Sequence, residues 1–539
     1  MGAHRTNADL IAETLYAAGV RYAAGIPSGQ VLALIEALRK AGITFILVSH
    51  EGTAGFMADV IGRVSGVPGV ALATVGPGAT NLTTGIGNAF LDRSPALAIT
   101  GQVPTAQLQR RVQMRIDHQA LFRPLTKATI QLTPGQVARQ LGEALALATA
   151  EPPGPVHLDL PEDVAVAPTT EPVPSLPARR ARAESPPARD AELARVGALL
   201  RRAQRPVAVL GLGLYRTAAL DALRRFLEAQ HLPFVTTNLA KGVVPEDHPL
   251  WLGVVGRARR KTIEDYLAQA DLVLGLGYDP VEIGYEEWLP PVPLVHVDWE
   301  PADIDSGVRL EHQVVGDLDD AVRRLAALPP AANAWDDRDL AAFRAHLERS
   351  LRVPGEGFQP WQALDIMREL FPREGILACD VGAHTHLVAT QWRVTVPGTL
   401  LVSNGWSSMG YAIPAALAAK LVHPERPVAA ILGDGCFLMT AGELATAARL
   451  RLPVVFVILN DNTLALIRVK QERRRYAYCG VDIADPPYQP PAEYFGVPNY
   501  VARTPEEFRA AFAAALRATG PVVVEALVRP EVYSTILYG

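Results

Sequence analysis

The chain has 539 residues, 49% of them hydrophobic and 20% charged, and its formal net charge at pH 7 is −5. This length exceeds what one hydrophobic core supports, so roughly two to four domains of a globular protein are expected. The mildly acidic balance gives no electrostatic case for nucleic-acid binding, and no apolar run approaches the ~18 residues of a membrane span.

Two stretches of the sequence read as linkers. Residues 166–190 are rich in Pro, Ala and Arg without an apolar period, and residues 328–358 are loose apart from a short helical pattern. Such composition does not pack a core and marks domain boundaries. The predicted domains are therefore 1–165, 190–328 and 358–539.

Within each predicted domain, short apolar runs alternate with helical patterns. Near-continuous apolar strands are typical of a parallel sheet that is buried on both faces. The sequence therefore predicts an α/β protein of three doubly wound parallel-sheet domains. The expected strands are 43–49, 69–75 and 96–100; 206–211, 232–237, 272–277 and 294–298; and 375–380, 427–433, 453–459 and 521–527.

In the first domain, an acidic residue follows an apolar strand directly. Glu51 stands in SHEGTAGFMAD, after ITFILVS and at the start of a helical pattern. An acid in that place can simply complement the helix dipole. A carboxyl group buried in an apolar cleft can instead serve as a proton-transfer group.

The middle domain carries only a weak nucleotide signal. VAVLGLGL places Gly211 and Gly213 after a strand, but the third glycine of a dinucleotide fingerprint is missing. A dinucleotide site is therefore not predicted there.

The third domain holds the strongest chemical motif. PVAAILGDGCF ends a strand at Gly433, Asp434 and Gly435, and the next strand, PVVFVIL, ends just before Asp461. Both acids then lie at the carboxyl ends of neighbouring parallel strands, where open α/β sheets bind ligands. Oxygen ligands and flanking glycines suit Mg²⁺ holding a diphosphate. The alternative for Asp434 alone is a helix cap in a tight turn.

The stretch from GDGCF to LNDNT resembles the thiamine-diphosphate-binding motif, and the chain is similar to acetolactate synthases over nearly its whole length. The resemblance implies thiamine diphosphate and Mg²⁺, with Asp434, Asp461 and the backbone oxygen of Thr463 as metal ligands. Most family members carry Asn in place of Asp461, and the flavin-free catabolic acetolactate synthases are similar in having Asp. The stretch GYDPVEIGYEEW (277–288) also resembles that branch, so FAD is not expected.

The resemblance also assigns roles around the coenzyme. Glu51 is implied as the catalytic acid that hydrogen-bonds the aminopyrimidine. Met409 is implied to force the bent shape of the coenzyme, although a methionine can also be a flexible core filler. The coenzyme-binding residues implied are Ile26, Pro27, Glu51, Gly76, Pro77, Asn81, Gly382, Ala383, His384, Ser407, Met409, Gly433, Asp434, Gly435, Cys436, Asp461, Thr463 and Leu464.

Substrate contacts are implied less firmly. Acetolactate synthases carry a glutamine three residues before an Asp, and here Met114 precedes Asp117 in that way, which favours a less polar or larger acceptor than pyruvate. His118 can equally be a surface or supporting histidine, and Lys127 a solvated lysine. The substrate candidates are Ser28, Gly29, Gln102, Met114, His118, Lys127, Leu466, Ile467 and Lys470.

The resemblance implies decarboxylation of a 2-oxo acid, pyruvate first of all, followed by carboligation. A 2-oxo acid decarboxylase or an acyloin lyase is the first alternative, and a non-catalytic nucleotide-binding protein is a remote one. The family builds its sites between subunits, so a homodimer or homotetramer is expected. Three cysteines, Cys379, Cys436 and Cys479, suit a reducing compartment and a cytoplasmic location.

Overall fold

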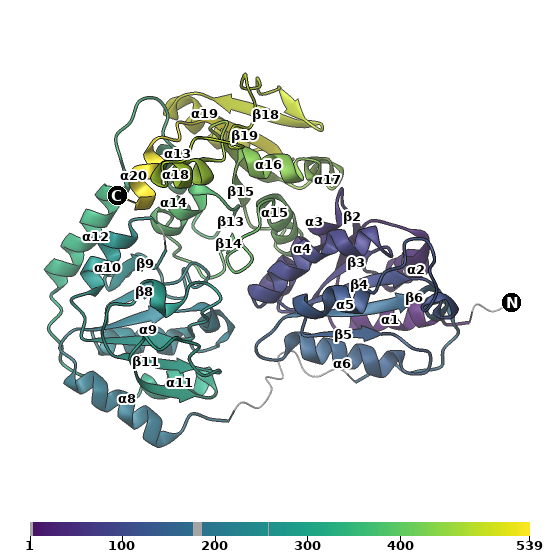
Figure 1. Ribbon diagram of the computed structural model, residues 1–539, viewed down its shortest axis with the longest axis horizontal. Helices are drawn as coiled ribbons and strands as arrows, with labels where there is room; N and C mark the ends of the chain where they lie inside the picture. The colour runs from purple at the N-terminus through teal and green to yellow at the C-terminus, as the bar shows by residue number, and fades with distance from the viewer. Residues whose placement is uncertain (1–3, 176–185, 257, 539) are drawn as a thin grey trace.

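The computed structural model describes residues 4–175, 186–256 and 258–538, and contains three α/β units, each built on one sheet (Figure 1). The three sheets have six, six and seven strands. Part of the linker expected at 166–190 lies outside the described residues. No helix in the described ranges has the length and apolar character needed to cross a membrane.

The first unit is a parallel sheet in the order β2-β1-β3-β4-β6-β5. Helices α1, α2 and α6 share one hydrophobic core, and α3 and α4 belong to another. The strands are β1 (Tyr22–Gly25), β2 (Thr44–Leu47), β3 (Gly69–Ala73), β4 (Ala96–Gln102), β5 (Ala128–Gln131) and β6 (Pro155–Pro161). The helices are α1 (Asn7–Ala17), α2 (Leu32–Ala41), α3 (Glu51–Ser65), α4 (Pro77–Leu91), α5 (His118–Phe122), α6 (Val137–Thr149) and α7 (Glu162–Val166).

The middle unit is a parallel sheet in the order β12-β11-β10-β7-β8-β9. The strands are β7 (Pro206–Leu210), β8 (Phe234–Thr236), β9 (Trp251–Val254), β10 (Leu272–Leu276), β11 (Leu294–Asp298) and β12 (Leu310–Val315). The helices are α8 (Asp190–Arg202), α9 (Leu220–Ala229), α10 (Arg260–Leu267) and α11 (Leu318–Leu325), and α12 (Asp337–Leu351) leads on to the third unit.

The third unit has the order β14-β13-β15-β16-β19-β18-β17, parallel except for β17 against β18. The strands are β13 (Ile376–Cys379), β14 (Leu400–Val402), β15 (Val428–Gly433), β16 (Val454–Asn460), β17 (Glu493–Tyr494), β18 (Val497–Ala502) and β19 (Val522–Leu527). The helices are α13 (Pro360–Leu370), α14 (Ala383–Gln391), α15 (Ala412–Val422), α16 (Asp434–Thr440), α17 (Glu443–Arg449), α18 (Ala465–Arg473), α19 (Pro505–Ala515) and α20 (Val532–Tyr538).

The predicted fold class is confirmed: all three sheets are dominated by parallel pairing, with helices against them. Every expected apolar run contains a strand. The strands without a predicted counterpart are β1, β5, β6, β9, β12 and β14, together with the hairpin of β17 and β18.

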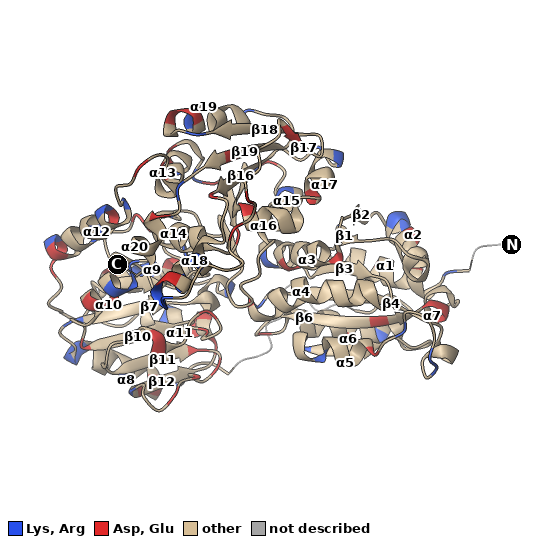
Figure 2. Cartoon of the chain, turned by 45° about the horizontal axis from the view of Figure 1, so that its top comes forward, with Lys and Arg blue, Asp and Glu red and all other residues tan. Residues whose placement is uncertain are grey.

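The first and third units share one hydrophobic core through α3, α4 and α15. Helix α4 carries no charged residue and is tan throughout in Figure 2. Its Gly85 lies against Gly55 of α3 so closely that a Cβ there would stand 2.4 Å from the Gly55 carbonyl carbon. Phe56 meets Tyr411 edge to face, with ring centroids 5.7 Å apart. This packing fixes α3, and with it Glu51, against the third unit.

A buried ion pair within the middle unit is hydrogen-bonded to the third unit. Lys241 donates to both carboxylate oxygens of Glu246, at 2.8 and 2.7 Å, and neither side chain is exposed. Glu246 also accepts the backbone N–H of Val394, at 2.8 Å. A buried charge that loses its partner is strongly destabilising, so this contact holds the two units in one arrangement.

A buried aspartate in the middle unit makes stability depend on pH. Asp298 ends β11, and burial raises its pKa to about 7 although Arg216 opposes the shift. The pKa of Asp298 is higher in the folded state than in the unfolded state. The free energy of unfolding is therefore not reduced by this group at about pH 4, and it falls as the pH rises from 4 towards 7. We expect Asp298→Asn to remove this loss, which is at most about 1.4 kcal/mol per pH unit.

The measurement is the urea midpoint of both proteins at pH 5 and pH 8. The urea midpoint of Asp298→Asn should exceed that of wild type by more at pH 8 than at pH 5. Asn keeps the oxygen that accepts the backbone N–H of Trp299, at 2.6 Å. Exposed Asp303 gives the control substitution, Asp303→Asn, which should show no such difference. An equal effect of Asp298→Asn at both pH values would contradict the raised pKa.

Candidate functional site

A pocket of about 190 Å³ opens at the carboxyl edge of the third sheet. It lies beyond β13, β15 and β16, which are adjacent in the sheet. The predicted residues that line it are Gly382, Ala383, His384, Ser407, Met409, Gly433, Asp434, Gly435, Cys436, Asp461, Thr463, Leu464, Leu466 and Ile467. The structure thus brings together predicted residues from four separate stretches of the third unit.

Two carboxylates stand at this edge because two neighbouring strands end there. The parallel register pairs Gly433 of β15 with Leu459 of β16, so Asp434 and Asp461 follow the same edge of the sheet. Asp434 Oδ1 accepts the N–H of Gly435 at 2.7 Å, and Asp461 Oδ1 accepts the N–H of Thr463 at 3.1 Å. Asp434 Oδ2 is buried and has no hydrogen-bond partner within the described residues.

The two acids disfavour each other's charge. Burial raises the pKa of Asp434 to about 6. Burial, and then the charge of Asp434, raises the pKa of Asp461 well above its usual value. Two carboxylates in a poorly solvated site are stabilised by a cation between them. The orphaned oxygen of Asp434 and the all-oxygen donor set fit Mg²⁺.

Helix starts face the same pocket. Helix α14 begins at Ala383 after Gly382, and α16 begins at Asp434. Unpaired N–H groups and the positive end of the dipole favour a phosphate at such positions. Burial lowers the pKa of His384 to about 4, so its ring is neutral, and His384 Nε2 has no hydrogen-bond partner among the described residues. These features fit a diphosphate bound through Mg²⁺.

A buried acid that the sequence analysis did not single out holds the turn of Met409. Asp380 is fully buried. Its Oδ1 accepts the N–H of Gly410 at 2.9 Å, and its Oδ2 accepts the N–H of Ala412 at 2.8 Å. The backbone on both sides of Met409 adopts positive φ angles, 52° at Ser407 and 86° at Gly410. Asp380 therefore fixes the position of Met409 in the pocket.

The predicted residues of the first unit form a separate group at the carboxyl edge of its sheet. Glu51 follows β2, Ile26 and Pro27 follow β1, and Gly76 and Pro77 follow β3; these three strands are adjacent. Glu51 is 7% exposed, and Asn81 donates its amide to Glu51 Oε2 at 3.0 Å. None of these residues lines the pocket of the third unit.

The substrate candidates are scattered. Leu466 and Ile467 line the pocket, whereas Lys470 lies further along α18 and does not. Ser28 and Gly29 stand at the short helix after β1. Gln102 is 2% exposed and accepts the N–H of Val103, and Met114 is 39% exposed with φ 65°.

Two substrate candidates are hydrogen-bonded within the first unit. His118 is not at the surface: it is 1% exposed, and both ring nitrogens have hydrogen-bond partners inside the first unit. The ammonium of Lys127 donates to the carbonyls of Ala150 and Pro152, each at 2.7 Å. These bonds hold Lys127 to the loop before β6.

One large pocket residue carries no signal in the sequence. Tyr533 lines the pocket from α20 and is 1% exposed. It lies near the end of the chain, outside every motif, so only the docking of α20 reveals it. Val381, Leu459 and Ala465 also line the pocket and flank predicted residues in the sequence.

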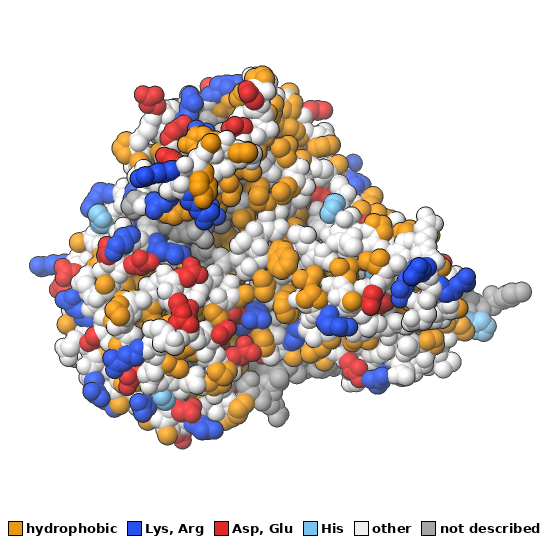
Figure 3. Space-filling view, in the orientation of Figure 1, with side chains coloured by type: hydrophobic (Ala, Val, Ile, Leu, Met, Phe, Trp, Pro, Cys, Tyr) orange, Lys and Arg blue, Asp and Glu red, His pale blue; other side chains and the backbone are white. Residues whose placement is uncertain are grey.

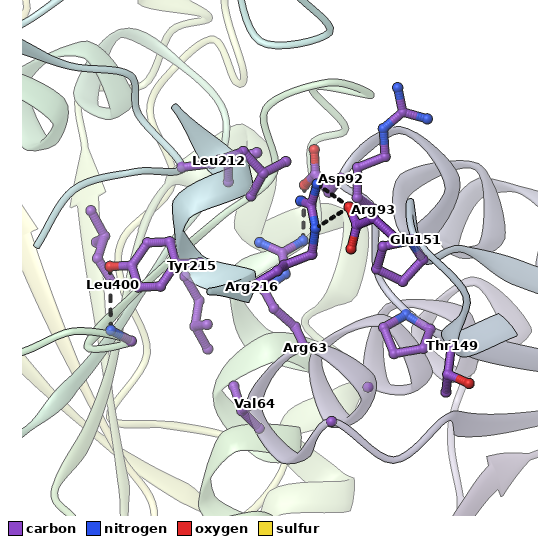
Figure 4. Close-up of a pocket in the computed structure, with 17 residues that line it drawn as sticks. Arg63, Val64, Asp92, Arg93, Thr149, Glu151, Leu212, Tyr215, Arg216 and Leu400 are labelled. Carbon is purple, nitrogen blue, oxygen red and sulfur yellow. Dashed lines mark hydrogen bonds and ion pairs between the residues drawn. The ribbon is translucent and has the colours of Figure 1, made fainter. Parts of the chain in front are cut away.

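Another cavity, of about 170 Å³, lies where the three units meet (Figure 4). Arg216 points toward Glu151, and their closest atoms are 2.6 Å apart. Arg63 is paired with Asp92 at 3.0 Å. The charges of this cavity are thus matched within the chain, and no predicted site residue lines it. We therefore place the candidate site at the third sheet.

Apolar side chains are exposed near the candidate site. Leu438 and Met439 of α16 are 57% and 60% exposed. Figure 3 shows hydrophobic side chains gathered on the concave side of the molecule, between the uppermost unit and the first unit. Exposed apolar patches of this kind mark interaction surfaces.

Family models and curated relatives cover almost all of the chain. The N-terminal TPP binding domain, the central domain and the C-terminal TPP binding domain of thiamine pyrophosphate enzymes match residues 5–121, 193–325 and 380–526. A probable acetolactate synthase large subunit of Methanocaldococcus jannaschii is 32% identical, covering 97% of this chain and 92% of that protein. An acetolactate synthase of Bacillus subtilis is 30% identical (96% and 92%), and a catabolic acetolactate synthase of Raoultella terrigena is 30% identical (96% and 94%).

Proposed function

The chain belongs to the acetolactate synthase family of thiamine pyrophosphate enzymes, and from this premise we propose that it decarboxylates pyruvate and joins the two-carbon product to a second pyruvate. The pair Asp434 and Asp461 in the third-unit pocket is the observation that carries the proposal. When bound, thiamine diphosphate supplies the nucleophilic carbon and the electron sink for this chemistry.

We assign Mg²⁺ to Asp434, Asp461 and the backbone oxygen of Thr463. The supporting observations are the orphaned Asp434 Oδ2 and the raised pKa values of both acids. The diphosphate is held by the starts of α14 and α16, with neutral His384 beside it. Met409, fixed through Asp380, supports the ring part of the coenzyme.

Glu51 holds a proton at the aminopyrimidine of the coenzyme in this proposal. The residue is 7% exposed and therefore largely shielded from bulk water. Asn81 holds one carboxylate oxygen and leaves the other, Oε1, on the side of the Gly76–Gly78 turn. Apolar surroundings exclude water from the pocket, with Leu464, Leu466 and Ile467 among its walls.

A second copy of the chain completes the site. The proposal is supported by the separation of Glu51 from the pocket of Asp434. It is also supported by the exposed apolar side chains of Leu438 and Met439 beside that pocket. A homodimer is the smallest assembly that joins the two groups, and a tetramer is compatible with it.

We also propose that the enzyme works without tightly bound FAD. Within the stretch 277–288, Tyr278 stacks on Tyr285 at 3.9 Å, and Trp288 donates its ring N–H to Tyr278 at 2.8 Å. This turn folds onto its own aromatic side chains. A cytoplasmic location is compatible with the free thiols of Cys379, Cys436 and Cys479.

Product analysis tests the reaction. Incubated with pyruvate, thiamine diphosphate and Mg²⁺, the enzyme should release one CO₂ for every two pyruvate molecules and yield acetolactate. One CO₂ per pyruvate with acetaldehyde would instead establish a simple decarboxylase. Met114 stands where the family resemblance implies a glutamine, and its apolar side chain favours a less polar or larger acceptor than pyruvate. Omission of the coenzyme is the control, and activity without it would overturn the proposal.

A further inference from the structure

His118 is bonded to the turn that follows β3. Its Nε2 accepts the backbone N–H of Gly76 at 3.1 Å, and the bond is buried. His118 starts α5, whose cap is the side chain of Asp117. The histidine therefore reaches from one segment of the first unit to the backbone of another.

Gly76 is held from a second side by the same segment. It has φ 70°, and a Cβ on it would lie 2.3 Å from the carbonyl oxygen of Met114. The turn continues to Gly78, where a Cβ would lie 3.1 Å from Glu51 Oε1. The Gly76–Gly78 turn is therefore clamped between the segment 114–118 and the proposed catalytic acid.

A buried chain of hydrogen bonds sets the tautomer of His118. Its Nδ1 lies 3.1 Å from Asp159 Oδ1 and 3.0 Å from the hydroxyl of Thr100. Since Nε2 accepts from Gly76, Nδ1 carries the proton and donates to Asp159. The carboxylate therefore keeps Nε2 in the accepting form.

The same network includes a second histidine. His157 Nε2 lies 2.8 Å from the hydroxyl of Thr100, and His157 Nδ1 lies 2.6 Å from that of Thr129. Burial lowers the pKa of His157 to about 3, so its ring is neutral. His118, His157 and Asp159 are close enough to hold a metal ion. Both nitrogens of each ring already have hydrogen-bond partners, so we interpret the group as a hydrogen-bond network.

We propose that His118 is a positioning residue that fixes the Gly76–Gly78 turn beside Glu51 and links it to the segment 114–118, which carries Met114. This inference rests on the proposed function for its catalytic consequence, but not for its structural content. No contact between His118 and substrate or coenzyme is needed. The role passes through the backbone of Gly76.

Amide hydrogen exchange in the coenzyme-free protein tests the structural part. His118→Phe keeps the volume of the ring and removes the acceptor, so peptides covering residues 74–81 should exchange at least about tenfold faster. His118→Gln places an amide oxygen at the distance of Nε2 and should restore slow exchange. If His118→Phe does not fold, His118→Asn serves instead, since its shorter amide does not reach Gly76.

His157→Phe is the matched control. The ring is equally buried and stacks on Phe122, with centroids 4.2 Å apart, but its hydrogen-bond partners are Thr100 and Thr129 and not Gly76. It should leave exchange in residues 74–81 within about twofold of wild type. Equal exchange in His118→Phe and wild type, or equal acceleration in both Phe variants, would overturn the inference.

Kinetics tests the catalytic part. Misplacing groups by about 1 Å can cost up to ~10²-fold in rate, so His118→Phe should lower kcat for pyruvate by roughly 10- to 100-fold. KM should change by less than about threefold, and His118→Gln should recover most of kcat. An unchanged kcat for His118→Phe would refute a positioning role. An inactive wild-type enzyme would instead refute the proposed function, while the exchange measurement would still decide whether His118 fixes the turn.

Discussion

Replacing Glu51 with Gln should lower turnover of pyruvate by roughly 10²- to 10⁴-fold, the range over which proton-transfer groups act. Gln has the shape of Glu but does not take up or release the proton. Glu51 is nearly buried beside Asn81, and the amide can still bond to that neighbour. The fold should therefore remain, because the substitution removes charge without changing volume.

The measurement is kcat for CO₂ release at saturating coenzyme and Mg²⁺, together with the thermal midpoint. Glu162→Gln provides the matched control, since Glu162 is exposed in the same unit. That variant should keep full activity. Activity of Glu51→Gln within threefold of wild type would refute the role assigned to Glu51.

Asp434→Asn should weaken the binding of Mg²⁺ and coenzyme at least about 100-fold, because one anionic oxygen ligand is lost. In the metal-free protein, by contrast, the same substitution should not lower the stability of the fold. The pKa of Asp434 is raised to about 6. Above that pH its buried charge faces Asp461 and destabilises the fold, so at pH 7.5 the metal-free variant should be at least as stable as wild type.

Thermal melting with and without Mg²⁺ and coenzyme separates the two effects. Wild type should gain stability on adding both, and Asp434→Asn should gain almost none. Glu472→Gln, at an exposed position of α18, should respond as wild type does. A full response of Asp434→Asn to Mg²⁺ would exclude Asp434 as a ligand. Dialysis of wild type against a chelator should likewise abolish activity.

The site of the third unit could be predicted because each of its two acids belongs to a short, recognisable sequence pattern. Asp434 and Asp461 each follow an apolar strand, and the parallel register brings strand ends together. Asp380 also follows a strand, but its partners Gly410 and Ala412 lie after the next strand of the sequence. Its role therefore became visible only from the packing of that turn.

His118 shows why other assignments needed the structure. The sequence places it after Asp117, where the family resemblance suggested a substrate residue. Its direction is set by Thr100 on β4 and Asp159 on β6, two strands distant from it in the chain. Strand β6 itself escaped prediction because His157 and Asp159 interrupt its apolar pattern. The polar residues that hide the strand are those of the hydrogen-bond network.

The pair of Lys241 and Glu246 also constrains how this protein can be rebuilt. Any chimera that exchanges the middle unit with that of a relative has to transplant the turn at Val394 along with it, because that turn donates to the same carboxylate. Crossover points placed between residues 325 and 394 take Glu246 and the backbone N–H that it accepts from different parents. Recombination libraries should therefore recover functional progeny mainly when both parts come from one parent.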